Sequence, residues 1–353
     1  MTDELAAYDY ELPEEQIARF PAARRDEARL LVVDRQRQTI EHRLVRDLPE
    51  LLRAGDCLAL NDTRVVRARL YGVRAATGGK WEGLFLNQTE AGHWRLLGQC
   101  RGRLQPGELI EIRPALVPES AERLKLRLIE KEEDDGIWQA EPIQPIDVWD
   151  GLEQFGTVPL PPYMHRDQAD AQDFERYQTV YARHLGSVAA PTAGLHFTPE
   201  LLDRCAARGV DRAFVTLHVG IGTFRPIAVE KLDQHLMHSE WCDVPAETVA
   251  RLAFAQARGG RRIAVGTTTT RALESAAQSG RLESWRGPTT LFIRPPYEFR
   301  AIDGLLTNFH LPRSTLLVLV STFAGHELIR EAYATAVREG YRFYSYGDAM
   351  LIV

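Results

Sequence analysis

Five of the histidines in the second half of the chain are candidates for chemistry, because histidine is the side chain best suited to moving protons near neutral pH. They are His196, His218, His235, His238 and His310. Three of them lie beside glycine, proline or hydroxyl residues, in AAPTAGLHFT (189–198), TLHVGIGTFRP (216–226) and TNFHLPRSTLL (307–317). This setting indicates either acid–base catalysis or hydrogen-bonded core side chains. For His218, which ends an apolar stretch, the core interpretation is favoured.

The same histidines raise a metal site as an alternative. The stretch HLMHSE (235–240) is the closest approach to metal-ligand spacing, but two histidines three residues apart fit a single zinc ion poorly. Four widely spaced cysteines form no CxxC pair, so they indicate neither a zinc knuckle nor a disulfide framework. The residues taken alone leave a metal-dependent hydrolase open.

Four consecutive threonines open GTTTTRALES (266–275), directly after the apolar run RRIAV. One threonine is explained by helix capping, whereas four hydroxyls followed by Arg271 favour binding of a carboxylate or phosphate at a helix N-terminus. The GxG pair Gly220 and Gly222 and the turn residue Asp348 are weaker signals, because glycine and aspartate are the usual residues of turns.

Apolar runs must position these residues. From about residue 211 onward, strand-like runs alternate with helical patterns, which is typical of an α/β domain with largely parallel strands; STLLVLV (314–320) is taken as one of the strands. Residues 67–141 alternate with period two between glycine turns, which predicts a small antiparallel barrel. We expect a large α/β barrel-like catalytic domain, formed by 1–64 and 152–353, with residues 65–151 inserted as a small β-barrel. Ligands of α/β folds collect at the carboxyl ends of strands.

Composition narrows the class of protein. The 353 residues are 44% hydrophobic and 26% charged, as in ordinary globular proteins, and the net charge of −6 argues mildly against a protein that coats nucleic acid. No signal peptide is visible in MTDELAAYDYELPEEQ, and the aliphatic run LLVLV is too short to span a bilayer. We expect a cytoplasmic protein without membrane contact.

Eight stretches together resemble the signature blocks of the S-adenosylmethionine:tRNA ribosyltransferase-isomerase family of the queuosine pathway. The likeness runs in order from Tyr8 to Ile352, with Ile221, Thr269 and Thr270 as minor departures from the family pattern. The stretches are LNDTRVVRARL, ERYQTVYA, GSVAAPTAGLHFT, TLHVGIGTFRP, HLMHSE, GTTTTRALES, LLTNFHLPRSTLL and YRFYSYGDAMLI.

The resemblance implies a reaction. Such enzymes transfer and isomerise the ribosyl part of S-adenosylmethionine onto 7-aminomethyl-7-deazaguanine at the wobble position of tRNA. The product is epoxyqueuosine-tRNA, and adenine and methionine are released. S-adenosylmethionine is then consumed as a co-substrate, and we expect no further cofactor and no metal.

This chemistry needs proton carriers, because a sulfonium acidifies the hydrogens on its 5′ carbon and both adenine and the attacking amine exchange protons. His196 is the first choice as general base or acid, and the catalytic candidates are His196, His218, His310 and Asp348. Candidates for substrate binding are Thr192, Gly194, Gly220, Gly222, Glu240, Thr267, Thr268, Arg271 and Asn308. For Glu240 and Asp348, structural turns and ion pairing are an equal alternative.

Two arginine clusters indicate a phosphate track for tRNA, since arginine matches phosphate geometry with two hydrogen bonds. They comprise Arg24, Arg25 and Arg29, then Arg64, Arg67 and Arg69. Surface arginines are more often merely solvated, and a small barrel is also a frequent RNA platform, so a noncatalytic RNA-binding protein is a further alternative. We expect a monomer whose partners are tRNA carrying a queuosine precursor and S-adenosylmethionine.

Overall fold

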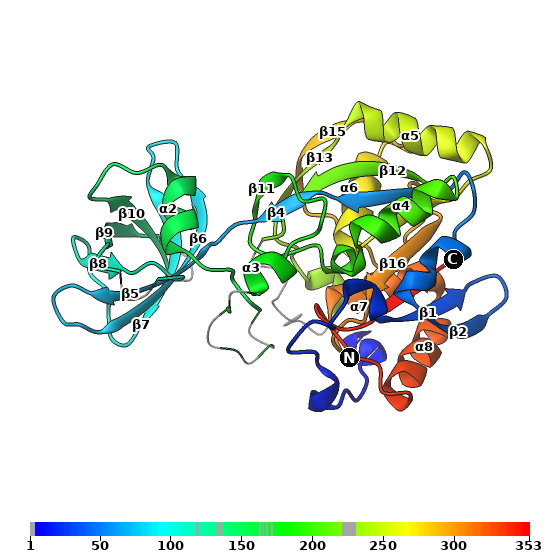
Figure 1. The fold of residues 1–353 in the computed structure, drawn as a ribbon, viewed down its shortest axis with the longest axis horizontal. Coiled ribbons are helices and arrows are strands. Elements are labelled where there is room, and N and C mark those ends of the chain that lie inside the picture. Colours follow the sequence, from blue (N-terminus) through cyan, green and yellow to red (C-terminus); the bar gives the residue numbers. More distant parts are fainter. Residues whose placement is uncertain are drawn as a thin grey trace. The chain divides into compact units, whose positions relative to one another are not determined.

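Two compact units make up the chain in the computed structural model (Figure 1). Residues 4–117, 120–132, 136–161, 164, 166, 169–170, 172–220 and 231–353 are described. One unit comprises Met1–Arg64, Pro162–His165 and Gln178–Val353, and the other Val65–Pro161 and Arg166–Tyr177. A mixed α/β unit and a closed antiparallel barrel confirm the predicted fold class, while the domain boundaries expected from the sequence stay a prediction.

A nine-stranded sheet forms the first unit. Its order is β15 (Trp285–Thr289), β13 (Glu240–Val244), β12 (Asp211–Leu217), β3 (Cys57–Asn61), β14 (Arg262–Val265), β16 (Gly304–Asn308), β17 (Ala349–Ile352), β1 (Arg29–Asp34) and β2 (Thr39–Leu44). Four of the eight pairings are parallel and four are antiparallel, so the expectation of largely parallel strands was wrong. Every residue of β3, β14, β16 and β17 is buried, as near-continuous apolar runs predict.

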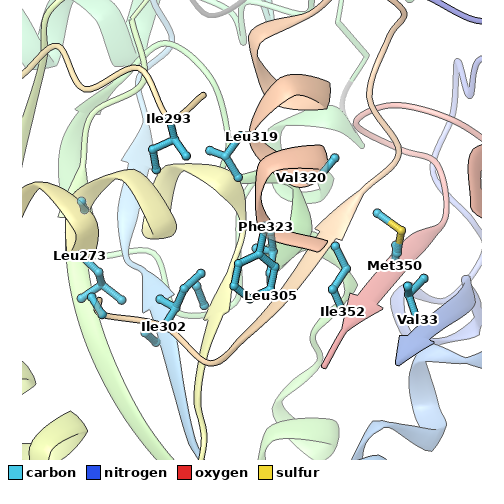
Figure 2. Packing of buried hydrophobic residues seen from close by; sticks show 14 of the residues in the cluster. Val33, Leu273, Ile293, Ile302, Leu305, Leu319, Val320, Phe323, Met350 and Ile352 are labelled. Atoms are coloured by element: carbon cyan, nitrogen blue, oxygen red, sulfur yellow. The ribbon is translucent and has the colours of Figure 1, made fainter. Parts of the chain in front are cut away.

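Helices cover this sheet, and one of them corrects a prediction. The apolar run at 314–320 is not a strand but the start of α7 (Thr315–Ala324), capped by Ser314, whose hydroxyl accepts a hydrogen bond from the Leu317 amide at 3.2 Å. A short apolar run cannot be assigned by periodicity alone, and here the serine cap decides. Figure 2 shows Leu319, Val320 and Phe323 of α7 within the buried cluster that contains Leu305 and Ile352 of the sheet. The other helices are α1 (Leu48–Leu51), α4 (Pro199–Ala207), α5 (Ala246–Ala257), α6 (Thr267–Ala276) and α8 (His326–Arg338), with short 3-10 turns including η3 (Arg25–Glu27) and η6 (Thr192–His196).

The second unit is a closed six-stranded barrel, the small antiparallel barrel that the sequence predicted. Its strands are β5 (Arg69–Arg74), β6 (Lys80–Gln88), β7 (Trp94–Cys100), β8 (Leu109–Ile112), β9 (Leu124–Lys131) and β10 (Ile137–Pro142). Helix α2 (Val148–Phe155), capped by Asp147, packs on the barrel. Gly151 of this helix lies so close to the Trp94 ring that an added Cβ would be 2.9 Å from it. Short elements complete the chain: α3 (Asp173–Arg176), and β4 (Thr63–Val65) paired with β11 (His184–Ser187). No helix among the described residues is long and apolar enough to cross a membrane.

Candidate functional site

A small pocket of about 60 Å³ lies at the carboxyl ends of β14 and β16, and we call it the threonine pocket. It collects residues from five of the stretches that the sequence singled out, which are far apart along the chain. Its lining is Ala189, Ala190, Pro191, Thr192, Ala193, Val219, Gly266, Thr267, Thr268, Thr307, Asn308, Phe309, His310, Leu316, Tyr344 and Ser345. Predicted substrate residues from separate loops therefore meet in one place.

The N-terminus of helix α6 forms one wall of this pocket. Gly266, with φ of +95°, turns the chain from β14 into the helix, a conformation that favours glycine. Thr269 and Thr270 donate their hydroxyls to the carbonyls of Val265 (2.6 Å) and Gly266 (3.2 Å), whereas Thr267 and Thr268 line the pocket. Because no side chain of a described residue caps the helix, its first amides remain available for an anionic group of a ligand.

Asn308 lines the same pocket and is held by several contacts. Its Nδ2 donates to the Tyr344 carbonyl at 3.1 Å and lies 3.2 Å from His196 Nε2. Since the Tyr344 carbonyl can only accept, Nδ2 is the amide nitrogen, and His196 Nε2 is the acceptor. Asn308 Oδ1 is buried and has no hydrogen-bond partner among the described residues, so one acceptor of the site is unsatisfied.

His196 lies behind Asn308 and does not line the threonine pocket. Burial lowers its pKa to about 4; a hydrogen bond with the Arg25 backbone opposes this effect, and the charges of Arg25 and Arg342 add to it. With Nε2 accepting from Asn308, the proton resides on Nδ1. These contacts suit a neutral histidine that orients Asn308.

His310 lines the threonine pocket directly. Its Nε2 lies 3.0 Å from the Thr307 hydroxyl, and Nδ1 makes no hydrogen bond to a described residue. Burial lowers the pKa of His310 to about 3, so the imidazole is neutral at pH 7. Of the three predicted catalytic histidines, His310 is the one whose ring reaches this pocket.

Arg271 and Glu240 form a buried ion pair rather than two separate contacts to a ligand. The guanidinium also donates from Nε to the Leu291 carbonyl at 3.0 Å, and Glu240 Oε1 accepts from the Gly220 amide at 3.0 Å. The Arg271 side chain is 5% exposed, and its Nη2 has no partner among the described residues. Nη2 of Arg271 is thus unsatisfied among the described residues, and Gly222 lies outside them.

Asp348 and Gly194 are both occupied by contacts within the protein. The carboxylate of Asp348 accepts from the backbone amides of Arg29 and Arg342, each at 2.8 Å, and burial raises its pKa against the effect of these bonds. A Cβ at Gly194 would lie 2.1 Å from the Tyr181 hydroxyl, so this glycine is required for packing. Neither lines the threonine pocket, whereas Thr192 does.

A second and much larger pocket, of about 1030 Å³, lies over β12, β13 and β11, and we call it the Trp241 pocket. His218 lines it, with Nδ1 2.8 Å from the Thr63 hydroxyl and its ring stacked on Trp241 at 5.2 Å. Burial lowers the pKa of His218, and His184 adds to this effect. The structure therefore assigns His218 to a different pocket from His310.

Asp62 lines the Trp241 pocket and was not predicted as a site residue. Its buried carboxylate accepts from the Thr216 hydroxyl at 2.7 Å through Oδ1, and Oδ2 lies 3.7 Å from His184 Nε2. Burial raises the pKa of Asp62. Its neighbour Asn61 bonds Thr268 and the Leu217 backbone. Polar residues directly after the apolar run CLAL were the available signal for both.

Ser187 separates the two pockets. Its hydroxyl donates to the Ala189 carbonyl at 2.6 Å and accepts from the Val219 amide at 2.9 Å. His184 and Leu185 lie on the Trp241 side of this contact, and Ala189 and Val219 lie on the threonine side. Segment 184–189, which contains Ser187, therefore contributes residues to both pockets.

Most of the arginines predicted to bind tRNA already contact groups of this chain. Arg24 pairs with Asp26 at 3.3 Å, Arg25 donates to the Leu195 carbonyl, and Arg29 lies over the Tyr341 ring. Arg67 and Arg69 pair with Glu153 and Glu82. Arg64 is exposed and has no carboxylate partner in the described part of the chain. Within that part, no group of three or more His, Cys, Asp or Glu residues is arranged to hold a metal ion.

The chain belongs to the family described as queuosine biosynthesis protein, whose pattern matches residues 5–352. It is 50% identical over 349 residues to the S-adenosylmethionine:tRNA ribosyltransferase-isomerase of Pelobacter propionicus, covering 98% of both chains. It is 52% identical over 345 residues to the protein of that name from Acidithiobacillus ferrooxidans, covering 98% of this chain and 96% of the relative. The crystal structure of an S-adenosylmethionine tRNA ribosyltransferase from Thermotoga maritima is similar, with a TM-score of 0.56, 38% identity and coverage of 98% and 100%. The resemblance seen in the sequence is thereby confirmed.

Proposed function

We propose that this protein transfers and isomerises the ribosyl group of S-adenosylmethionine onto 7-aminomethyl-7-deazaguanine at the wobble position of tRNA. Epoxyqueuosine-tRNA is the product, and adenine and methionine are released. The observation that carries the proposal is full-length similarity to enzymes named for this activity, together with a pocket that gathers the predicted substrate residues.

The threonine pocket takes part of S-adenosylmethionine in this proposal. Its volume of about 60 Å³ is well below the roughly 300–1,000 Å³ of sites that enclose a whole small molecule. It suits one polar group, and the uncapped amides of α6 with the Thr267 and Thr268 hydroxyls favour the methionine carboxylate.

His310 acts as the base that removes the 5′ proton of the sulfonium substrate. A neutral imidazole can accept a proton, and Nδ1 makes no bond to a described residue while Nε2 is oriented by Thr307. Asn308 presents Oδ1 to a hydroxyl or an amine of the substrate, and His196 keeps the Asn308 amide in this orientation. Arg271 Nη2 is a second donor for the substrate, with its charge balanced by Glu240.

The deciding experiment is incubation of the protein with S-adenosylmethionine and tRNA that carries the aminomethyl base. Adenine and methionine are quantified by chromatography, and the modified nucleoside is identified by its mass after digestion. Equal release of adenine, methionine and modified nucleoside is expected.

The matched control is the same tRNA with unmodified guanosine at the wobble position, which lacks the aminomethyl group and is expected to give no product. Absence of adenine with the competent tRNA would overturn the proposal. Adenine formed equally with both tRNAs would show hydrolysis instead of transfer.

A further inference from the structure

The Trp241 pocket is large enough for a nucleotide and has an apolar wall that faces solvent. Val180, Leu185 and Trp241 line it and are 41%, 45% and 39% exposed, although large apolar side chains are usually buried. A volume of about 1030 Å³ lies at the upper end of small-molecule sites. Exposed aromatic and aliphatic surface in a deep pocket is typical of sites that take an unstacked base of single-stranded RNA.

Asp62 gives this pocket a defined polar end. Oδ1 is fixed by the Thr216 hydroxyl at 2.7 Å, whereas Oδ2 has no hydrogen bond to a described residue and lies 3.7 Å from His184 Nε2. An ionised carboxylate only accepts hydrogen bonds, through about four lone pairs. On its Watson–Crick edge guanine offers two adjacent donors, N1–H and the 2-amino group. Adenine and cytosine offer one donor beside an acceptor, so a carboxylate selects the guanine edge.

We propose that the Trp241 pocket receives the 7-deazaguanine base of the tRNA substrate, with Asp62 accepting hydrogen bonds from N1–H and the 2-amino group. The base packs against Trp241, whose ring is held by the stacked His218. This inference rests on the proposed function and adds the residue that recognises the acceptor base.

The position of Asp62 would hold the nucleobase close to the proposed site of the ribosyl donor. Consecutive residues at a strand end point to opposite sides. Asn61 bonds Thr268 of the threonine pocket, while Asp62 lines the Trp241 pocket. A base held by its Watson–Crick edge at Asp62 keeps its aminomethyl group free to approach the neighbouring pocket, where the proposed base His310 lies.

Positive charge at the rim suits the flanking phosphates. Arg183 and His184 are exposed, and Arg183 lies over the Phe214 ring at 4.5 Å without an ion-pair partner among the described residues. Arg251 and Arg286, by contrast, are paired with Asp211 and Asp243. A stacked arginine with free N–H groups is a common contact to an RNA backbone.

The test measures binding of two free bases by isothermal titration calorimetry. The probes are 7-aminomethyl-7-deazaguanine and its analogue without the 2-amino group, 7-aminomethyl-7-deazahypoxanthine. Wild type is expected to prefer the first by about 10- to 100-fold, the range of a hydrogen bond to a charged group. In Asp62→Asn this preference is expected to shrink to about threefold or less.

Two further variants distinguish the loss of a specific hydrogen bond from a general loss of folded protein. Asp203→Asn replaces an exposed carboxylate lining the same pocket and should keep the wild-type preference. Trp241→Ala should weaken both bases about equally, by roughly tenfold or more, because stacking does not depend on the 2-amino group. Equal affinity of wild type for the two bases would overturn the assignment. So would an unchanged preference in Asp62→Asn.

The tRNA reaction separates this inference from the proposed function. Asp62→Asn should raise the KM for the precursor tRNA and leave the KM for S-adenosylmethionine unchanged. If wild type releases adenine and Asp62→Asn keeps its KM for tRNA, the base site is refuted and the reaction stands. If wild type releases no adenine, the reaction is refuted, and the calorimetric preference still decides whether the base site exists.

Discussion

The threonine pocket and the Trp241 pocket lie in the same unit of the chain and differ in size and in lining. The threonine pocket holds about 60 Å³, and the polar part of its lining consists of hydroxyls, an amide and a buried histidine. The Trp241 pocket holds about 1030 Å³ and contains carboxylates, arginines and exposed apolar side chains. One pair of neighbouring residues, Asn61 and Asp62, contributes to the two different environments.

In the proposed function, this difference in size and lining gives the two pockets different tasks. A small pocket with little water strengthens each hydrogen bond and charge interaction, which suits proton transfer on a small substrate. A wide pocket with stacking surface and cations suits part of a macromolecule. Alternation of side chains along β3 and β12 allows both without a separate scaffold.

Replacement of His310 by Gln should have the largest effect, because His310 is the one histidine among the described residues that lines the threonine pocket. Loss of a general base typically costs about 10²- to 10⁴-fold in turnover. We expect kcat for adenine release to fall within that range, with little change in the KM for tRNA. Steady-state kinetics with the precursor tRNA provide the measurement.

His93→Gln is the control for that variant, since His93 lies in the barrel unit and bonds Gln139. It should retain wild-type turnover. His196→Gln is the informative comparison, because glutamine can still accept a bond from Asn308 while carrying no imidazole. A loss in His196→Gln as large as in His310→Gln would move proton transfer to His196.

The pH dependence of the free energy of unfolding should also differ between variants of His310 and His218, the histidines of the two pockets. Burial lowers the pKa of His310 to about 3, below the value of about 6.5 in an unfolded chain. Between these values the unfolded state binds more protons. The contribution of His310 is therefore fully present above pH 6.5 and is lost on acidification, by about 1.4 kcal/mol per pH unit.

His310→Gln should therefore flatten the fall in the free energy of unfolding between about pH 6 and pH 4, measured by urea denaturation. His218→Gln should flatten it less, because His218 is half-buried in the open pocket. If the His218 variant changed the slope more, the threonine pocket would not be the less hydrated of the two.

Residue patterns predicted the threonine pocket better than the Trp241 pocket. Four hydroxyls at a strand-to-helix turn indicated an anion site, and Thr267, Thr268 and Asn308 do lie together. Asp62 follows the apolar run CLAL, which marks a strand end, and Trp241 lies within β13, but neither local sequence shows which cavity the side chain faces. That property arises from the pairing of β12 with β3 and β13, which brings distant segments together.

The spacing of the candidate residues along the sequence could not predict how deeply their side chains are buried. His196 was the first choice as general base or acid, but packing places it behind Asn308. Asp348 looked like a turn residue or a catalytic acid, and its two oxygens bind backbone amides. The α7 segment was predicted as a strand because a short aliphatic run is compatible with either a strand or a helix. The Ser314 cap is the feature that identifies it as a helix.

The four threonines offer a smaller and sharper test of the anion site. Thr267→Val removes a hydroxyl that lines the threonine pocket, and we expect the KM for S-adenosylmethionine to rise about tenfold. Thr270→Val removes a hydroxyl that bonds the Gly266 carbonyl within the helix, and it should leave that KM unchanged. Equal effects of the two substitutions would indicate that helix stability, rather than ligand contact, explains the run.

The smallest effect is expected for single arginine substitutions on the salt dependence of tRNA binding. Binding is expected to weaken as salt rises, because arginine–phosphate contacts release counterions despite the net charge of −6. Arg64→Ala should lower the slope of log K against log salt by about one, since Arg64 is exposed and unpaired among the described residues. Arg69→Ala should change it less, because Arg69 already pairs with Glu82. Filter binding at several salt concentrations measures both slopes, and a larger change for Arg69 would mean that the ion pair opens to take a phosphate.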